Sequence, residues 1–201
     1  MISKIIASQK ITAVEELLDQ YDKIVIVTHV SPDGDAIGSS LGLYHYLNDL
    51  GNDVNIIVPN SFPDFLEWIP GAKDIFDYEK YPEYAQKLIA EAELIFCLDF
   101  NVPKRSHHLA PFIEAAKGKK VLIDHHPDPT EFCDVMISYP EISSTSELVF
   151  RLICRMGDFE VMSYNTATAI YTGMMTDTGA FTYNSNNIEI YYIIQRGNFL
   201  N

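Results

Sequence analysis

Acidic residues and histidines in this sequence follow short apolar segments, where they could form a shared chemical site. The segment Lys23–His29 ends in a histidine, Asp33 and Asp35 follow it closely, and the segment Leu94–Asp99 ends in an acid. If these segments are parallel strands, their carboxyl ends lie at one edge of a sheet, where such sheets bind ligands. We therefore predict that one site draws on these residues: His29, Asp33, Asp35, Asp99, Asp124, His125, His126 and Asp177.

The charge of this cluster indicates what it binds. Four ionised aspartates in one crevice, Asp33, Asp35, Asp99 and Asp177, repel one another by several kcal/mol per close pair unless protons or cations neutralise them. Two divalent ions would balance the four charges. The donors are oxygen and imidazole without thiolates, which favours Mn²⁺, with Mg²⁺ as a substitute, over structural zinc. Two such ions about 3.5–4 Å apart can activate water for phosphoester hydrolysis.

Each of these residues alone also has an ordinary structural explanation. A strand-end aspartate such as Asp35 commonly forms a turn or caps a helix. A single histidine on a strand is more often a structural residue than a ligand. Several polar residues that each follow an apolar segment are harder to explain by turns alone, so we favour the metal site.

Three further motifs allow alternative interpretations. The segment Gly38–Gly42 matches the G-x-S-x-G pattern, but Ser40 falls inside a predicted helix rather than directly after a strand, which argues against a serine hydrolase. The segment Ser143–Thr145 is predicted to cap a helix, with phosphate contact left open. The pair His107–His108 is predicted at a solvated helix start, with a substrate-facing basic patch as the alternative.

Composition limits the kind of protein and its partners. The chain has 201 residues, 47% of them apolar, and its net charge is −14 with a pI of about 4.6. This suits a globular fold and argues against binding of long nucleic acid. The three cysteines have no C-x-x-C spacing, which favours a reducing compartment, and we expect a cytoplasmic protein. We expect no membrane span, because no segment approaches about 18 apolar residues.

Short apolar segments alternate with helix-period segments, which predicts an α/β fold with a mainly parallel central sheet flanked by helices. The predicted strands are Lys23–His29, Asp53–Val58, Leu94–Asp99, Lys120–Asp124 and Val135–Tyr139. The predicted helices are one opened by a Thr12-x-x-Glu15 capping box, Asp35–Leu50, Tyr84–Ala92, His107–Ala116, one from the Ser144-x-x-Glu147 box to Arg155, Asn165–Thr176 and Ile188–Asn201. The aromatic residues of Pro59–Gly71 are expected to cover the sheet edge: Phe62, Phe65 and Trp68.

Four segments together resemble the motifs of a known family. They are THVSPDGDAIGSSLG (Thr28–Gly42), FCLDFN (Phe96–Asn101), IDHHPDP (Ile123–Pro129) and TDTGAFTY (Thr176–Tyr183). In order and spacing they resemble the motifs of the DHH phosphoesterases, over about residues 12–195. The P-D-G-D-A-I-G-S form is similar to the branch of oligoribonucleases, 3′-phosphoadenosine 5′-phosphate phosphatases and cyclic-dinucleotide phosphodiesterases. Manganese pyrophosphatases tend to have N-P-D-x-D-S there.

The resemblance implies a role for each residue of the predicted site. It implies these metal ligands: His29 and Asp33 for a first ion, Asp35, His125 and Asp177 for a second, and Asp99 as the bridge. It also implies that Asp124 orients His125 and that His126 faces the scissile phosphate as a hydrogen-bond or proton donor. Gly34 and Gly38 are expected where the backbone passes close to the metals.

The resemblance further implies a catalytic domain over residues 1–195, with residues 196–201 as the start of a linker or a truncated end. Family members of this branch carry a second, substrate-binding domain with a glycine-rich motif, and nothing after Asn184 resembles it. The expected function is manganese-dependent hydrolysis of phosphate esters in short oligonucleotides, 3′-phosphoadenosine 5′-phosphate or dinucleotides. A manganese-dependent inorganic pyrophosphatase and a non-catalytic metal- or nucleotide-binding module stay open as alternatives. We expect no long duplex as a partner, and a homodimer is compatible with the resemblance.

Overall fold

The centre of the molecule is one parallel β-sheet. The structure, a computed structural model, describes residues 4–183. Its sheet has six strands in the order β3-β2-β1-β4-β5-β6, and every neighbouring pair is parallel. The strands are β1 (Lys23–Val27), β2 (Asp53–Val58), β3 (Phe76–Asp77), β4 (Leu94–Leu98), β5 (Lys119–Asp124) and β6 (Val135–Ser138). The predicted α/β class with a parallel sheet is confirmed, and the two-residue strand β3 is an addition.

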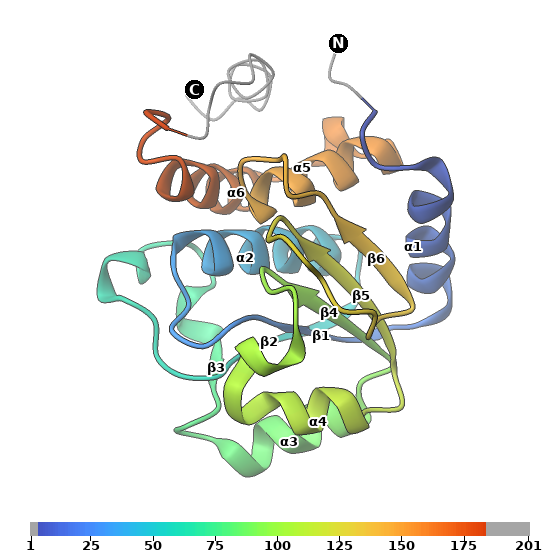
Figure 1. Ribbon diagram of the computed structural model, residues 1–201, viewed down its shortest axis with the longest axis vertical. Helices are drawn as coiled ribbons and strands as arrows, with labels where there is room; N and C mark the ends of the chain where they lie inside the picture. The colour runs from blue at the N-terminus through green and yellow to red at the C-terminus, as the bar shows by residue number, and fades with distance from the viewer. Residues whose placement is uncertain (1–3, 184–201) are drawn as a thin grey trace.

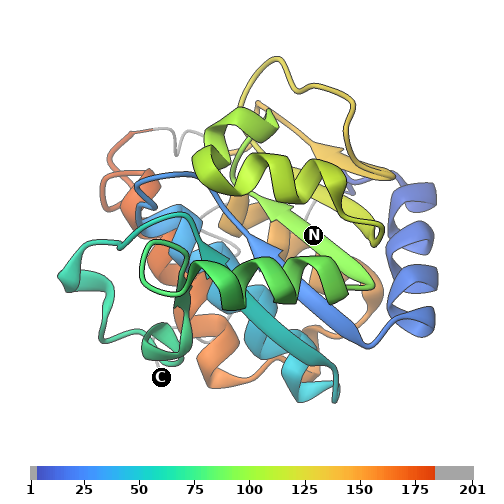
Figure 2. The same cartoon turned by 90° about the horizontal axis from the view of Figure 1, so that it is seen from below.

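Helices cover both faces of the sheet, as Figures 1 and 2 show. They are α1 (Ser8–Gln20), α2 (Gly34–Asp49), α3 (Pro82–Glu91), α4 (Ala110–Ala115), α5 (Thr145–Met156) and α6 (Tyr164–Asp177). Along β1, Ile24 and Ile26 join the core under α1, α2, α5 and α6, whereas Val25 and Val27 join the core under α3 and α4. Successive strand residues face opposite sides, so a strand covered on both faces must be apolar throughout.

Two helix starts test the predicted capping boxes. Helix α1 begins at Ser8, and its cap residue Ala7 makes no side-chain cap hydrogen bond, so the box predicted at Thr12 is wrong. The buried residue Ile11 extends the apolar face of α1 upstream of that box. The predicted cap of α5 is confirmed, because Ser144 Oγ accepts a hydrogen bond from the Glu147 backbone N–H at 3.1 Å.

Two other local expectations are confirmed only in part. The predicted helix His107–Ala116 is confirmed over Ala110–Ala115, which form the short α4. Its first residues belong instead to a 3₁₀ segment, Pro103–Leu109, because His107 has a left-handed φ of 50°. Phe65 and Trp68 do not cover the sheet, since 64% and 62% of their surfaces are exposed. The chain there forms only a short 3₁₀ turn, Asp64–Leu66, in which Leu66 is the buried residue.

Two expectations lie outside the described residues, namely the helix over Ile188–Asn201 and the domain boundary at residue 195. Within the described residues, no helix is long and apolar enough to span a lipid bilayer.

Helices α2 and α6 approach each other closely because glycines line their contact. Gly34, Gly38 and Gly42 recur every four residues on α2 and face α6. A Cβ on Gly38 would lie 2.6 Å from the Cα of Gly173, and one on Gly34 would overlap the side chain of Thr176. These glycines therefore serve helix packing, whereas the resemblance implied that they let the backbone pass close to the metals.

This contact yields a prediction about stability. Replacing Gly38 by alanine should lower the free energy of unfolding by about 1–3 kcal/mol, because the new methyl group meets backbone atoms of α6 that cannot rotate away. Gly42→Ala is the matched control, since its Cβ would meet mainly the side chain of Ile170. Urea titrations measure the free energy of unfolding of both variants. A Gly38→Ala variant as stable as Gly42→Ala would contradict the described approach of the helices.

Candidate metal centre

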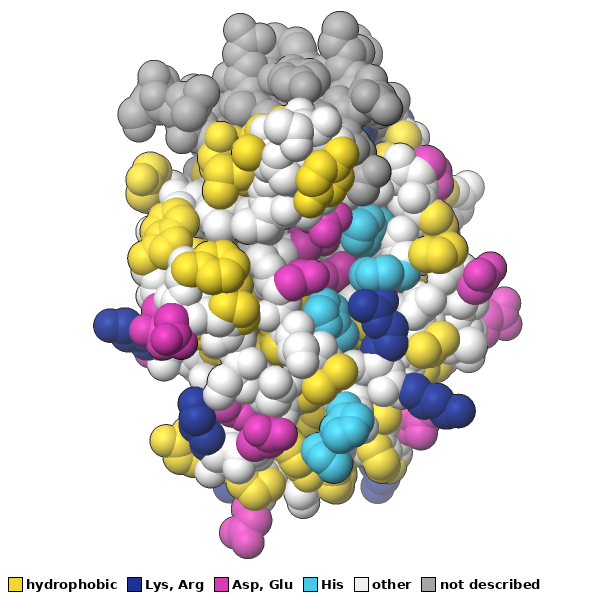
Figure 3. Space-filling view, turned by 60° about the vertical axis from the view of Figure 1, so that its left-hand side comes forward, with side chains coloured by type: hydrophobic (Ala, Val, Ile, Leu, Met, Phe, Trp, Pro, Cys, Tyr) yellow, Lys and Arg dark blue, Asp and Glu magenta, His cyan; other side chains and the backbone are white. Residues whose placement is uncertain are grey.

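The predicted site residues come together at the carboxyl edge of the sheet. His29 follows β1, Asp99 follows β4, and Asp124 ends β5. Asp35 lies in the first turn of α2, and Asp177 is the last residue of α6. Figure 3 shows acidic side chains and histidines gathered on this face of the molecule. Five separate elements thus supply one cluster.

The first group of donors surrounds His29. Its Nε2 lies 3.4 Å from Asp99 Oδ2 and 3.9 Å from Asp33 Oδ1. Its Nδ1 donates to the Val30 carbonyl at 2.8 Å, so Nε2 carries the lone pair. That Nε2 is buried and has no hydrogen-bond partner among the described residues. An orphaned imidazole nitrogen that faces two carboxylates fits a metal ligand.

The second group surrounds His125. Its Nε2 lies 3.6 Å from Asp99 Oδ1, 3.6 Å from Asp177 Oδ2 and 3.8 Å from Asp35 Oδ2. These separations are too long for hydrogen bonds. They are shorter than the roughly 4.2 Å that can separate two atoms each bound about 2.1 Å from one ion. Asp99 belongs to both groups, through Oδ2 toward His29 and Oδ1 toward His125.

The electrostatics of the cluster also suit cations. Burial raises the pKa of Asp99 well above its ordinary value, and the charges of Asp35 and Asp33 raise it further. Burial likewise raises the pKa of Asp35. The pKa of Asp177 is raised to about 6, by burial and then by the charge of Asp35. Without a cation, the ionised form of each of these three carboxyl groups is therefore destabilised.

The loop after β4 holds Asp99 in an uncommon conformation. Its φ is 65°, in the left-handed region, and its N–H donates to the Ile123 carbonyl at 3.1 Å. A residue other than glycine there costs roughly 1–2 kcal/mol, less for aspartate and asparagine. The strained residue is the carboxylate shared by both donor groups.

Asp33 has a structural task beside its place in the first group. Its Oδ1 accepts hydrogen bonds from the backbone N–H groups of Asp35 and Ala36, both at 3.0 Å. Asp33 is therefore the N-cap of α2. The capping role considered as an alternative for Asp35 belongs to Asp33 instead. Asp35 itself lies in the first turn and is buried.

Asp124 orients a different histidine from the one expected. Its Oδ1 accepts from His126 Nδ1 at 2.8 Å, and its Oδ2 accepts from the His126 backbone N–H at 3.1 Å. The expectation that it orients His125 is wrong, because alternate residues of an extended chain point to the same side. His125 instead has its Nδ1 3.3 Å from the Ile142 carbonyl.

Sequence reasoning missed two residues that contact the cluster. Thr145 and Ser146, at the start of α5, hydrogen-bond the carboxylates of Asp35 and Asp99. The serine and threonine run was identified as a helix cap, with phosphate contact open. No sequence pattern links it to Asp35, 110 residues away.

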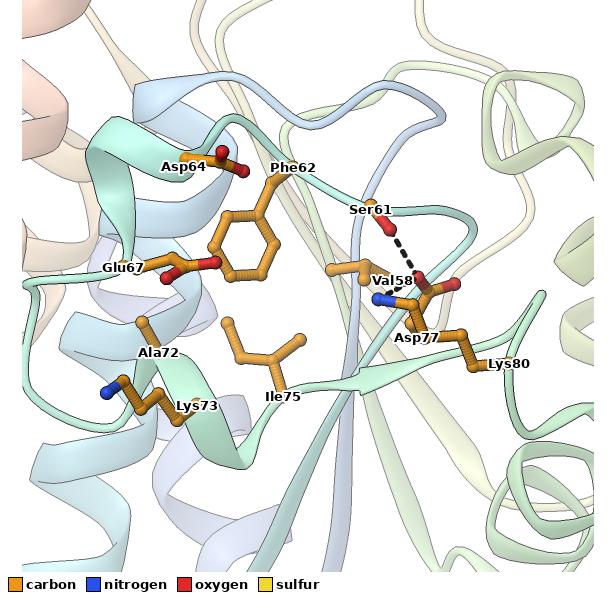
Figure 4. Close-up of a pocket in the computed structure, with 10 residues that line it drawn as sticks. All are labelled: Val58, Ser61, Phe62, Asp64, Glu67, Ala72, Lys73, Ile75, Asp77 and Lys80. Carbon is orange, nitrogen blue, oxygen red and sulfur yellow. Dashed lines mark hydrogen bonds and ion pairs between the residues drawn. The ribbon is translucent and has the colours of Figure 1, made fainter.

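A separate cavity of about 380 Å³ lies beside β2, and Figure 4 shows the residues that line it. None of the predicted site residues lines it. Its buried acid, Asp77, accepts from Ser61 Oγ at 2.7 Å and pairs with Lys80 at 3.2 Å. The charge of Asp77 is therefore already compensated by residues that line the cavity.

The sequence of this chain is similar to those of known phosphoesterases. The chain is 33% identical over 183 residues to the bifunctional oligoribonuclease and PAP phosphatase NrnA of Thermus thermophilus, covering 90% of this chain and 52% of that protein. It is 31% identical over 183 residues to the cyclic-di-AMP phosphodiesterase GdpP of Geobacillus thermodenitrificans, covering 85% and 27%. The chain therefore spans about half the length of NrnA, and less of GdpP.

Two solved structures share the fold. An exopolyphosphatase-related protein from Bacteroides fragilis superposes with a TM-score of 0.96 at 60% identity, over 98% of this chain and 58% of that one. An exonuclease RecJ bound to manganese superposes with a TM-score of 0.59 at 16% identity, over 98% and 49%, which supports the fold alone. The model of the DHH family, N-terminal domain, matches residues 23–174, well over half of the chain. The chain therefore belongs to the DHH family.

Proposed function

We propose that this chain is a manganese-dependent phosphoesterase that hydrolyses phosphate esters of small nucleotides. The observation that carries the proposal is the position of Asp99, whose two carboxylate oxygens face two different histidines and their neighbouring acids. A carboxylate in this position can bridge two ions about 3.5–4 Å apart, the separation found in two-metal hydrolytic centres. The names of two relatives describe enzymes that act on oligoribonucleotides, PAP and cyclic di-AMP.

In this proposal the donor groups hold one ion each. The proposed ligands are His29 and Asp33 for one ion and Asp35, His125 and Asp177 for the other. Asp99 would bind both, since its two carboxylate oxygens lie near His29 and His125. Oxygen and imidazole donors favour Mn²⁺, with Mg²⁺ as a substitute. When bound, such ions lower the pKa of water and stabilise charge that develops at phosphorus.

In this proposal His126 donates a hydrogen bond or a proton to the phosphate ester. Because its Nδ1 is bonded to the buried carboxylate of Asp124, the ring is held in one orientation. In the imidazolium form, in which both ring nitrogens carry a proton, Nε2 can donate a hydrogen bond or a proton to the phosphate ester. His126 Nδ1 also lies 3.7 Å from Asp99 Oδ1, so this histidine borders the donor groups. Asp124 acts through His126 as a positioning residue.

The net charge of the protein favours short substrates over long nucleic acids. A net charge of −14 repels a long polyphosphate chain. Close to the cluster, the Arg105 carbonyl accepts from the Val30 N–H at 2.7 Å, which places a segment with Lys104 and Arg105 beside the loop that follows His29. We propose short oligonucleotides, 3′-phosphoadenosine 5′-phosphate and dinucleotides as substrates, and not long duplexes.

A substrate panel tests the proposed function. Purified protein with Mn²⁺ should release product from 3′-phosphoadenosine 5′-phosphate, a linear dinucleotide or a cyclic dinucleotide, and chelation should abolish the release. Pyrophosphate and inorganic polyphosphate belong in the panel, since one similar structure is described as exopolyphosphatase-related. Cleavage of the inorganic substrates alone would favour the pyrophosphatase alternative. Metal binding without any hydrolysis would favour a non-catalytic module.

Asp99→Asn tests the shared carboxylate. The variant should lose both ions, because the amide removes the charge that the two donor groups share. Activity should fall by more than the roughly 10–100-fold typical of losing an outer partner of a metal ligand. Metal analysis and the substrate panel measure this. The control Asp134→Asn alters a pair with Lys119 at 2.8 Å that contributes to neither donor group and should keep full stoichiometry. Near-normal Mn²⁺ content in Asp99→Asn would refute the bridge.

The metal-free protein should lose stability as pH rises. Asp177 has a folded-state pKa of about 6, above its unfolded value, so folding is favoured while it is protonated. The free energy of unfolding in chelator should therefore fall by about 1–3 kcal/mol between pH 4 and 6. Denaturant titrations across this range measure it. Asp177→Asn should flatten the dependence, and a rise in stability across the window for the wild type would contradict the described burial.

A further inference from the structure

The amino-terminal end of α5 is directed at the carboxylates of the cluster. The Thr145 backbone N–H donates to Asp35 Oδ2 at 2.6 Å, and the Ser146 N–H donates to Asp35 Oδ1 at 2.9 Å. The Thr145 hydroxyl donates to Asp99 Oδ1 at 2.9 Å. All four residues are buried. A single threonine therefore contacts one carboxylate through its backbone and another through its side chain.

These donors are not used by the helix itself. The first N–H groups of a helix have no partner within it. In α5 the Ser144 side chain caps only the N–H of Glu147, at 3.1 Å. The N–H groups of Thr145 and Ser146 remain for Asp35, whose charge also suits the positive end of the helix. The phosphate contact that the sequence left open at Thr145 is thus taken by the protein's own carboxylates.

Packing holds this end of α5 in place. Gly173 of α6 faces it so closely that a Cβ there would overlap Ser146 Oγ and lie 3.1 Å from Asp35 Oδ1. On the other side, the buried carboxylate of Glu147 accepts from Ser143 Oγ at 2.6 Å and from Arg151 Nε at 2.8 Å. The start of α5 therefore has little freedom to shift, and neither do the carboxylates bonded to it.

We propose that Thr145 is a positioning residue that fixes Asp35 and Asp99 relative to each other, so that the two donor groups bind their ions together. The proposal rests on the proposed metal function. Asp35 belongs to the His125 group, whereas Asp99 contacts both His29 and His125 and so belongs to both groups. The Thr145 hydroxyl sets the rotation of the Asp99 carboxylate, and its backbone N–H holds Asp35 in register with it.

Thr145→Val tests the proposal, because valine keeps the shape and the backbone N–H but removes the hydroxyl. Titration of the metal-free chain with Mn²⁺, followed by calorimetry and by electron paramagnetic resonance of the ion pair, should show half-saturation at about 10–100-fold higher Mn²⁺. The signal of the coupled pair should also weaken. Thr145→Ser restores the hydroxyl and should bind within about threefold of the wild type, well inside that range.

Thr166→Val is the matched control for loss of a buried threonine hydroxyl. Thr166 is also fully buried, but its hydroxyl contacts Ser163 Oγ at 3.0 Å, at the far end of α6 from Asp177. It should bind Mn²⁺ like the wild type. Equal Mn²⁺ affinity in Thr145→Val and wild type would overturn the proposal, as would equal losses in Thr145→Ser and Thr145→Val.

Measuring Mn²⁺ binding separately from substrate cleavage distinguishes failure of this proposal from failure of the proposed function. Wild-type protein that binds two Mn²⁺ but cleaves no substrate would refute the phosphoesterase, while the affinities of the Thr145 variants would still decide the role of the hydroxyl. Wild-type protein that binds no Mn²⁺ would overturn both. Melting curves in chelator, compared between Thr145→Val and Thr166→Val, establish that a lost signal reflects the site and not an unfolded chain.

Discussion

The buried carboxylates of the cluster repel one another, and the rest of the site depends on how this repulsion is compensated. Asp35 and Asp99 are each only 1% exposed, and the charges of Asp33 and Asp35 both act on Asp99. Removing such groups from water is costly unless donors or cations compensate them. The protein compensates in part, with backbone N–H groups from α5 and a threonine hydroxyl. The unbonded Nε2 of His29 fits the same account, because it is a ligand atom left for a cation.

The helices that carry the acids are held by close packing. Glycines on α2 let that helix lie against α6, and Gly173 brings α6 against the start of α5. Asp35, Asp177 and the donors at Thr145 therefore come from three helices whose separations are fixed by backbone contact. Longer side chains at the interface would separate the carboxylates. Close packing among α2, α5 and α6 thus holds the acidic side chains near one another despite their repulsion.

Much of this arrangement could be predicted from the sequence. Parallel strands place their carboxyl ends at one edge, so the apolar segments before His29 and Asp99 were enough to predict that these residues converge. Local patterns were less informative where tertiary packing decides. The sequence showed neither that Asp124 holds His126 nor that Thr145 reaches Asp35, since such contacts depend on the direction of side chains across distant elements. Trp68 illustrates the same limit, because a large apolar side chain does not by itself specify which way a short turn faces.

The left-handed backbone at Asp99 limits which amino acids this position can accept. Only glycine, asparagine and aspartate adopt that conformation readily, because other side chains crowd the adjacent carbonyl. Of these three, aspartate alone offers two anionic oxygens to opposite neighbours. The conformation thus limits this position to three residues, and the need for two anionic oxygens selects aspartate among them. A replacement for Asp99 would therefore have to satisfy two demands at once, one set by the main chain and one by the side chain.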